Sequence, residues 1–194
     1  MITNSIEKVA SEIKGGNVVA FKTDTVYGLS SVIDDDNAVD KIFKLKRRYE
    51  GKPLIVLVPL KFDISKLIKV NNNILKLTKQ FWPGPLTIIG KVNCSVARGV
   101  TPYDTLSVRM PNDKVCQRLL SAVGKPITST SCNLSGQPIL TNAASIDKTF
   151  DVCVLDGGEC TGGIPSTIVD CSGETIKVLR EGSIKEADIF NALK

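Results

Sequence analysis

The sequence predicts an α/β fold in which helices flank a mixed β-sheet. Short apolar runs typical of buried strands interleave with segments of helical periodicity along the whole chain. The 194 residues suffice for one well-cored domain, and they contain no internal repeat, low-complexity tract or linker. We therefore expect a single domain over residues 1–194.

Helices and strands alternate from the N-terminus onward. Apolar residues recur at helical spacing over 6–13 and are followed by Gly15-Gly16, a glycine pair that favours the end of a helix. The uncharged apolar run 18–21 is typical of a buried strand. A second helix is predicted over 38–45, because Asp34-Asp35-Asp36 supplies the acidic groups that a helix N-terminus favours.

The same alternation continues toward the C-terminus. Residues 54–58 are predicted to form a second buried strand, and the helical spacing over 74–81 ends at Pro83-Gly84-Pro85. Helices are also predicted over 114–123 and from Lys185 onward. Further strands are predicted over residues 86–89, 105–109, 127–129, 152–155, 166–170 and 176–179.

Three polar loops lie at the ends of predicted strands. Residues 22–28 follow the first strand, residues 47–53 precede the second, and residues 131–136 follow a third. Because α/β proteins bind their ligands in loops at strand ends, we expect the functional site there.

The composition excludes several kinds of site. The chain contains no histidine, so a Ser-His or Cys-His mechanism is excluded, and a zinc site would need four scattered thiolates. None of the six cysteines belongs to a Cys-x-x-Cys pair, and we expect them, Cys132 included, to be buried structural thiols. The net charge of +5 suits anionic partners, but it is also common among ordinary enzymes.

The sequence predicts a cytoplasmic protein. Its N-terminus lacks the basic and apolar regions of a signal peptide. The longest uncharged apolar run, at residues 54–60, is far too short to cross a bilayer. We therefore expect reduced thiols and no membrane partner.

Two polar clusters predict a site for an anionic substrate. Lys46-Arg47-Arg48 follows a predicted helix and offers fixed positive charge that suits phosphate or carboxylate oxygens. Ser131-Cys132-Asn133 offers a hydroxyl and an amide on a turn that Gly136 closes. Taken singly, such groups are also common on solvated surfaces, and Arg109 or Arg180 alone would suggest no more than a surface ion pair.

A larger pattern emerges when ordered sequence blocks are taken together. The blocks are Thr23-Asp24-Thr25-Val26-Tyr27-Gly28-Leu29, Lys46-Arg47-Arg48, Pro53-Leu54-Ile55-Val56, Trp82-Pro83-Gly84-Pro85-Leu86-Thr87, Ser107-Val108-Arg109-Met110-Pro111, Thr130-Ser131-Cys132-Asn133-Leu134-Ser135-Gly136, Asp156-Gly157-Gly158, Pro165-Ser166-Thr167-Ile168-Val169-Asp170 and Leu179-Arg180-Glu181-Gly182. From about residue 16 to residue 184 the chain resembles the YrdC/Sua5 family of threonylcarbamoyl-AMP synthases. The resemblance implies the family's single-domain form, a twisted open mixed sheet with flanking helices of the YrdC/RibB type.

The resemblance also implies a reaction. Family members condense L-threonine, bicarbonate and ATP into threonylcarbamoyl-adenylate and release pyrophosphate, for the t6A modification of tRNAs that read ANN codons. Such a nucleotidyltransferase needs mainly positioning and stabilisation of phosphate charge, so lysine and arginine suffice without a histidine base. Mg²⁺ is expected to arrive with the ATP phosphates. The implied protein partners are those of the t6A transferase complex, and direct tRNA binding is left open.

The same resemblance assigns roles to residues. The implied catalytic residues, a Lys-x-Arg pair and a Ser-x-Asn pair around the ATP phosphates, are Lys46, Arg48, Ser131 and Asn133. The implied ATP-binding residues are Arg48, Lys52, Thr105, Ser129, Ser131 and Arg180. The implied threonine-binding residues are Thr25, Arg109 and Ser166, and we expect Arg109 to bind the threonine carboxylate through two hydrogen bonds. No residue is expected to bind a metal directly.

Three positions differ from the family pattern. Lys22 stands where proline is frequent, and Lys52 replaces a frequent asparagine, so both differences keep the site basic. Leu57 replaces a histidine that often lines the threonine pocket. The leucine removes a polar contact from the region that distinguishes amino-acid side chains.

Three other functions are considered. An RNA-binding module with a basic surface is one, although only 5% of the residues are aromatic, which leaves few side chains on which bases could stack. A catalytically silent paralogue of the same fold is the second. The third, a carbamoyl-adenylate domain like that of hydrogenase maturation proteins, is disfavoured because such domains lie in longer chains with zinc-finger-like cysteine pairs.

Overall fold

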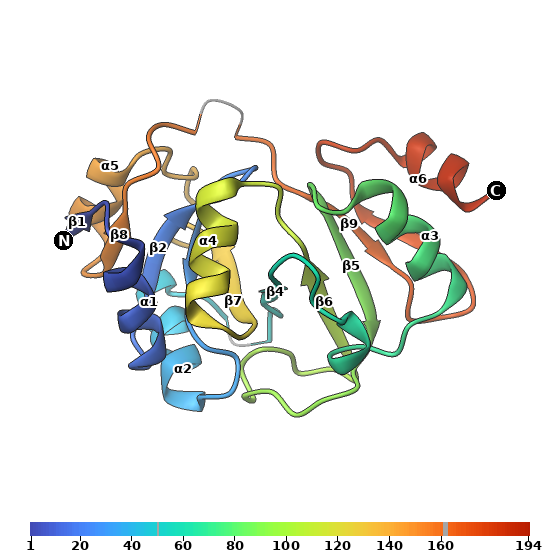
Figure 1. Cartoon of the computed structure of the whole chain (residues 1–194), viewed down its shortest axis with the longest axis horizontal. Helices are drawn as coiled ribbons and strands as arrows, with labels where there is room; N and C mark the ends of the chain where they lie inside the picture. The colour runs from blue at the N-terminus through green and yellow to red at the C-terminus, as the bar shows by residue number, and fades with distance from the viewer. Residues whose placement is uncertain (50, 161–162) are drawn as a thin grey trace.

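A ten-stranded sheet forms the centre of the computed structural model, which describes residues 1–49, 51–160 and 163–194 (Figure 1). The strand order is β1-β8-β2-β3-β7-β4-β6-β5-β9-β10, with four parallel and five antiparallel neighbouring pairs. The predicted α/β class with a mixed sheet is therefore confirmed. In chain order the elements are β1 (Ile2–Thr3), α1 (Ile6–Lys14), β2 (Val19–Lys22), β3 (Tyr27–Ser30), α2 (Asp36–Lys46), β4 (Ile55–Leu57), the 3₁₀ helix η1 (Ile64–Lys66), α3 (Asn72–Phe81), β5 (Leu86–Lys91), β6 (Thr105–Arg109), α4 (Lys114–Val123), β7 (Ile127–Ser131), α5 (Ala143–Thr149), β8 (Cys153–Leu155), β9 (Thr167–Asp170), β10 (Lys177–Arg180) and α6 (Glu186–Leu193).

Side-chain caps fix where the helices begin. Ser5 Oγ accepts a hydrogen bond from the backbone N–H of Lys8 at the start of α1. At the start of α2, Asp35 Oδ1 accepts from the backbone N–H groups of Asn37 and Ala38, so the acidic run marks this helix start as predicted. Within the described residues, none of the helices has the length and apolar composition that a transmembrane span requires.

Strands β1 and β3, the 3₁₀ helix η1 and helix α5 are not among the elements that the sequence predicts. The sequence predicts a loop over residues 22–28, whereas strand β3 begins at Tyr27 and pairs antiparallel with β2. The turn between them is short because the backbone N–H and the hydroxyl of Thr23 both donate to the carbonyl of Val26. Helix α5 is not predicted, because Ala143 and Ile146 are its two buried residues and they make a weak periodic signal.

The sheet separates two hydrophobic cores. On β2, Ala20 packs into the core that includes α2, whereas Val19 and Phe21 pack into the core formed with α1 and α4. On β4, Val56 and Leu57 divide in the same way. Because successive strand residues point to opposite faces, α2 lies on one face of the sheet, and α1 and α4 lie on the other.

The face that carries α1 and α4 also carries the candidate site. The side chains that pack under these two helices come from β2, β8, β7 and β4. Figure 1 shows β6, β5 and β9 farther along the sheet, toward the end where the C-terminus lies. Ser107 and Arg109 on β6 alternate with Leu106 and Val108, which belong to the other core. The face thus continues past α4 as a surface that bears polar side chains.

At Gly182, which follows β10, the backbone passes close to the backbone of residues 165–167. A Cβ atom at Gly182 would lie 2.1 Å from the carbonyl oxygen of Pro165 and 2.8 Å from the backbone nitrogen of Thr167, so the backbone would have to move. We expect Gly182→Ala to lower the free energy of unfolding by about 1–3 kcal/mol, as overpacking does. Urea unfolding followed by circular dichroism measures the change.

Gly173→Ala is the matched control for this prediction. The nearest atom to a Cβ at Gly173 is the carbonyl oxygen of Thr175, at 4.0 Å. Its free energy of unfolding should change by no more than about 0.5 kcal/mol. Equal effects of the two substitutions would contradict the close approach at Gly182.

Candidate active site

One pocket collects most of the predicted site residues. Its volume is about 350 Å³, and strands β4, β5, β6, β7 and β9 contribute to its walls. Its apolar residues include Ile55, Leu57, Ile89 and Ile168. Its charged residues are Arg48, Arg109 and Arg180, and its hydroxyl side chains are Thr23, Thr25, Ser107, Ser129, Thr130, Ser131 and Ser166. No aspartate or glutamate is among the described lining residues; Asp24 pairs with Arg109, so the excess positive charge of the pocket comes from Arg48 and Arg180.

Arg109 is a buried charge in this pocket. Only 4% of its surface is exposed. Its Nε donates to the carbonyl of Gly84 (3.1 Å), its Nη1 to Thr25 Oγ1 (2.7 Å) and its Nη2 to Asp24 Oδ1 (2.6 Å). A guanidinium group has five N–H donors, so two remain for a ligand oxygen. The expected bidentate contact with a carboxylate is compatible with this count.

The turn between β2 and β3 is tied to the loop that follows β8. The Tyr27 hydroxyl donates to the carbonyl of Gly158 (2.8 Å) and accepts from the backbone N–H of Gly157 (2.9 Å). Lys22 Nζ donates to the carbonyls of Gly157 (3.1 Å) and Glu159 (3.2 Å). Lys22, one of the three departures from the family pattern, therefore fastens a loop and does not line the pocket.

Ser166, directly before β9, is held by an arginine and a threonine. Arg180 Nε and Nη2 donate to the carbonyl of Ser166 at 3.0 and 2.8 Å, and Nη2 also donates to Ser166 Oγ at 3.2 Å. Ser166 Oγ lies 2.7 Å from Thr87 Oγ1. The next residue, Thr167, accepts from the backbone N–H of Gly182 and donates to the carbonyl of Ile184. These contacts fix the backbone on which Ser166 enters the pocket.

Lys46 is buried beneath the turn that follows β7. Its exposed fraction is 1%. Its Nζ donates to the carbonyls of Ser131 and Asn133 and to Asn133 Oδ1, the last at 3.1 Å. Burial lowers the pKa of the Lys46 ammonium to about 8, because desolvation penalises the charged form. All three ammonium N–H groups are thus used by the turn, and Lys46 does not line the pocket.

The supported turn presents Ser131 to the pocket. Ser131 Oγ donates to Asn133 Oδ1 (2.7 Å), and Asn133 Nδ2 donates to the carbonyl of Gln137 (2.7 Å). Arg48 enters the same pocket, anchored by a hydrogen bond from its Nη2 to the carbonyl of Pro53 (3.1 Å). Burial lowers the pKa of Arg48, but an arginine remains charged at neutral pH.

The structure brings seven of the predicted site residues together. Those that line the pocket are Thr25, Arg48, Arg109, Ser129, Ser131, Ser166 and Arg180. Lys46 and Asn133 lie behind Ser131, at the hydrogen bonds just described. Lys52 is exposed, and neither it nor Thr105, at the start of β6, lines the pocket. Of the predicted loop 47–53, residue 50 lies outside the described residues.

Sequence reasoning assigned no role to several lining residues, among them Ser107, Gly28 and Thr23. Ser107 was not singled out, although alternate positions of a strand share a face and Arg109 was already a candidate. Gly28 lines the pocket at a point where a Cβ would lie 2.6 Å from Ser129 Oγ. Thr23 carries no local signal, because a threonine that bonds its own turn looks like any turn residue.

The cysteines behave as structural residues. Five of the six are buried, as predicted, and Cys94 is half-buried. Burial raises the pKa of Cys132 far above its usual value even though Lys46 is near, so the thiol stays protonated at neutral pH. The described residues include no group of three or more His, Cys, Asp or Glu side chains placed to hold a metal ion.

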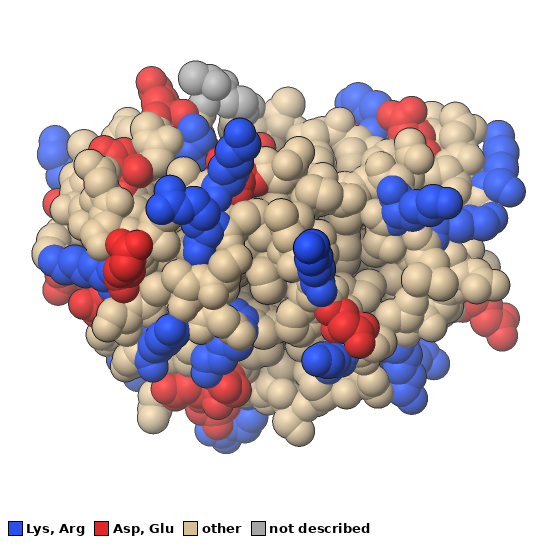
Figure 2. All heavy atoms as spheres, in the orientation of Figure 1, with Lys and Arg blue, Asp and Glu red and all other residues tan. Residues whose placement is uncertain are grey.

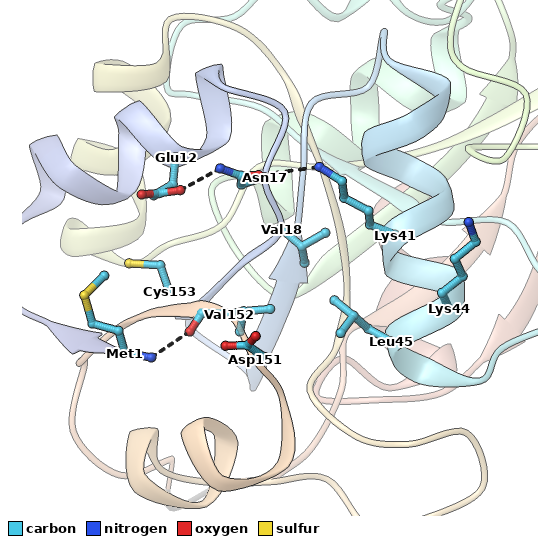
Figure 3. Close-up of a pocket in the computed structure, with 10 residues that line it drawn as sticks. All are labelled: Met1, Glu12, Asn17, Val18, Lys41, Lys44, Leu45, Asp151, Val152 and Cys153. Carbon is cyan, nitrogen blue, oxygen red and sulfur yellow. Dashed lines mark hydrogen bonds between the residues drawn. The ribbon is translucent and has the colours of Figure 1, made fainter.

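A second, more open groove of about 640 Å³ lies between α1, α2 and the start of β8 (Figure 3). None of its described lining residues is a predicted site residue. Asn17 donates to Glu12 Oε2 (2.7 Å), and the N-terminal ammonium of Met1 donates to the carbonyl of Val152 (3.0 Å). Many of its polar groups therefore bond to one another, and its charges are of both signs. The arginine-lined pocket is the better candidate for the site.

Comparisons with known proteins place the chain in a family. The family model Sua5_yciO_yrdC, described as "Telomere recombination", matches residues 11–182. The threonylcarbamoyl-AMP synthase of Pyrococcus abyssi is 36% identical over 189 residues, which cover 95% of this chain and 56% of that protein. A putative threonylcarbamoyl-AMP synthase of Methanocaldococcus jannaschii is 37% identical over 183 residues, covering 92% of this chain and 86% of that protein.

A solved structure gives the same result. The crystal structure of P. abyssi Sua5 complexed with L-threonine has a TM-score of 0.94 and 34% identity, and the match covers 100% of this chain and 61% of that chain. The chain thus spans little more than half the length of the Pyrococcus proteins it matches.

The Asp24–Arg109 pair predicts a large stability effect. The two side chains are 12% and 5% exposed, so removal of the carboxylate leaves a buried positive charge without its counter-ion. We expect Asp24→Ala to lower the free energy of unfolding by about 3–5 kcal/mol in a denaturant titration.

The exposed pair Lys125–Asp34 supplies the control. Its side chains are 41% and 56% exposed, so Asp34→Ala should cost less than about 1 kcal/mol. A small and equal effect at both sites would show that the buried pair does not hold Arg109 in place.

Proposed function

This chain belongs to the Sua5/YciO/YrdC family, and we propose that it is an enzyme that makes threonylcarbamoyl-AMP. The proposed reaction joins L-threonine, bicarbonate and ATP and releases pyrophosphate. The observation that carries the proposal is that Arg48, Arg109 and Arg180 converge on one pocket with no carboxylate among its described lining residues. Each of the three substrates brings an anionic group, so a pocket with excess positive charge suits all of them. The relatives named threonylcarbamoyl-AMP synthases support the same assignment.

The proposed steps balance without a histidine base. The threonine ammonium first releases one proton to solvent. The neutral amino nitrogen then bonds to the carbon of bicarbonate, one N–H proton leaves with the bicarbonate hydroxyl as water, and a carbamate forms. A carbamate oxygen then bonds to the α-phosphorus of ATP while the bond from that phosphorus to the bridging oxygen breaks, and its electron pair leaves with pyrophosphate. In-line transfer of this kind depends on positioning and on stabilisation of charge at phosphate oxygens.

The residues divide between two ends of the pocket in this proposal. Arg48 and Ser131 act at the ATP phosphates, with Lys46 and Asn133 holding the turn that carries Ser131. Arg109 and Ser166 act at the threonine carboxylate. Lys46 thus contributes to catalysis through the shape of the turn, since its three N–H groups are already bonded to it.

Magnesium is part of the proposal as a companion of ATP. The oxygen donors of the described pocket are hydroxyls such as Ser129 and Ser131, with no carboxylate among the lining residues. Such a set fits an ion held mainly by phosphate oxygens and water, and bound there it would neutralise phosphate charge. Further proposed partners are the proteins of the t6A transferase complex, with tRNA as the molecule finally modified.

The surface gives an RNA-binding function less support. On the face drawn in Figure 2, lysine and arginine side chains are interspersed with acidic ones and form no continuous stripe. A protein that binds nucleic acid along its backbone usually presents such a stripe.

Removal of Arg48 tests the proposed function directly. We expect wild-type protein to release pyrophosphate from ATP and bicarbonate when L-threonine is present, with less release for L-serine and none without an amino acid. Arg48→Ala should reduce the rate about 100- to 1000-fold, because one preorganised donor to a developing charge contributes that much in other enzymes. The measurement is a coupled pyrophosphate assay.

Arg98→Ala is the control for this prediction. Arg98 is 89% exposed and pairs with Asp36, away from the pocket, so its rate should equal that of the wild type. If wild-type protein binds ATP but releases no pyrophosphate with any amino acid, the enzyme assignment is wrong. An RNA-binding module or a silent paralogue would then be the better hypothesis.

The lowered pKa of Lys46 predicts a pH-dependent affinity for ATP. In the folded protein the ammonium loses its proton near pH 8, below its usual value of 10.5, because desolvation disfavours the charged form. Deprotonation removes one of the three donors that hold the turn, so we expect the Kd for ATP to rise about tenfold as pH passes through this value. Isothermal titration calorimetry measures the Kd, and ATP itself does not titrate in this range.

Lys46→Met provides the reference for the pH series. Its Kd for ATP should be high at every pH and should not change as pH passes through 8, because the titrating group is gone. A wild-type Kd that stays constant from below pH 8 to well above it would contradict the role assigned to Lys46.

A further inference from the structure

Thr87 is a buried polar residue next to the pocket that the proposed mechanism does not yet use. It lies on β5, directly opposite Arg109 on β6, and it is 0% exposed. Among the described residues its hydroxyl has one hydrogen-bond partner, Ser166 Oγ, at 2.7 Å. A threonine at this sheet position does not line the pocket itself, so it can act on a ligand only through its neighbour.

The donors and acceptors around Ser166 Oγ can be counted. A hydroxyl oxygen has one proton to donate and two lone pairs that accept. Arg180 Nη2 lies 3.2 Å from Ser166 Oγ, and an arginine can only donate, so one lone pair of Ser166 is occupied. The direction of the hydrogen bond with Thr87 then decides what Ser166 can offer to a ligand.

Burial sets that direction. If Ser166 donated to Thr87, the Thr87 proton would be left without an acceptor in a position that water does not reach. If Thr87 donates to Ser166, the Thr87 proton has its acceptor, and the proton left over belongs to Ser166, which lines the pocket and can donate it to a ligand or water there. In this second arrangement both lone pairs of Ser166 accept, one from Arg180 and one from Thr87. The Ser166 proton is then free, and the oxygen can take part in a further hydrogen bond only as a donor.

We propose that Thr87 is a positioning residue that, together with Arg180, makes the Ser166 hydroxyl a pure donor aimed at the carboxylate of the amino-acid substrate. The proposal rests on the proposed function, since it assumes that Ser166 contacts threonine. It also gives Arg180 a role besides its charge, because one of its N–H groups fills the first lone pair of Ser166. A hydroxyl that can only donate favours an anionic oxygen over a neutral or cationic group.

The experiment measures the Kd for L-threonine by isothermal titration calorimetry, with the whole chain. Thr87→Val removes the hydroxyl and keeps the shape of the side chain, so Ser166 gains a free lone pair and its proton is no longer directed. We expect the Kd to rise about three- to tenfold, as for the loss of one oriented hydrogen bond. Thr87→Ser keeps the hydroxyl, and its Kd should stay near that of the wild type.

Thr128→Val is the matched control. Thr128 is also a threonine on a strand and 0% exposed. Its hydroxyl bonds to Ser31, directly after β3, and not to a residue that lines the pocket. This variant should lose stability, as any buried hydroxyl deletion does, without a change in the Kd for threonine. Thr87→Ala makes the same comparison if the valine variant does not fold.

A double-mutant cycle distinguishes an effect of Thr87 on the Ser166 hydroxyl from a general loss of order in the pocket. Ser166→Ala should weaken threonine binding, and Thr87→Val added to it should cause no further loss, because Thr87 acts only through Ser166. Additive effects would overturn the proposal, and so would a Thr87→Val protein with the wild-type Kd. Wild-type protein that does not bind threonine at all would instead overturn the proposed function, and the proposal would fall with it.

Discussion

The site depends on the burial of one guanidinium group. Arg109, on β6, is 4% exposed, and its three protein partners come from two other segments: Asp24 and Thr25 from the β2–β3 turn, and Gly84 from the proline-rich turn before β5. Burial of a charge without partners costs several kcal/mol of folding free energy, so the folded chain must keep these segments in contact with Arg109. The walls of the pocket are therefore fixed by the same contacts that make burial of the arginine tolerable. Stability and site geometry cannot be changed independently at this point.

The structure uses a second buried cation in a similar way. Lys46 gives its three N–H groups to the turn after β7, and Arg180 gives two of its nitrogens to the backbone of Ser166. Much of the positive charge near the pocket thus serves to hold loops in place. Charge-assisted hydrogen bonds to carbonyl oxygens are stronger than neutral ones, which suits loops that must keep a fixed shape around the pocket. A basic motif in the sequence need not mean that each of its residues contacts the ligand.

Local patterns predicted most of the strands and helices, because buried strands and amphipathic helices leave signals within a few residues. Strand β3 was not predicted because Tyr27-Gly28-Leu29-Ser30 is neither a continuous apolar run nor a regular alternation of apolar and polar residues. Its pairing with β2 and β7 makes it a strand. The site residues became visible mainly through the family resemblance. The burial of Lys46 and the contact of Asp24 with Arg109, 85 residues away in sequence, depend on tertiary packing that no local pattern encodes.

The apolar residues of the pocket explain why its charges are effective. Ile55, Leu57 and Ile89 lie on the same sheet face as Arg109. Leu57 is paired with Arg109, and Ile55 and Ile89 are paired with Ser107, two residues before it on β6. Apolar side chains exclude water and lower the local dielectric, which strengthens every interaction between an arginine and an anionic substrate. A site built in this way stabilises developing negative charge with fixed groups that do not titrate near neutral pH. The absence of histidine from the sequence is consistent with the reaction that we propose, in which charge stabilisation and positioning take the place of proton transfer by a side-chain base.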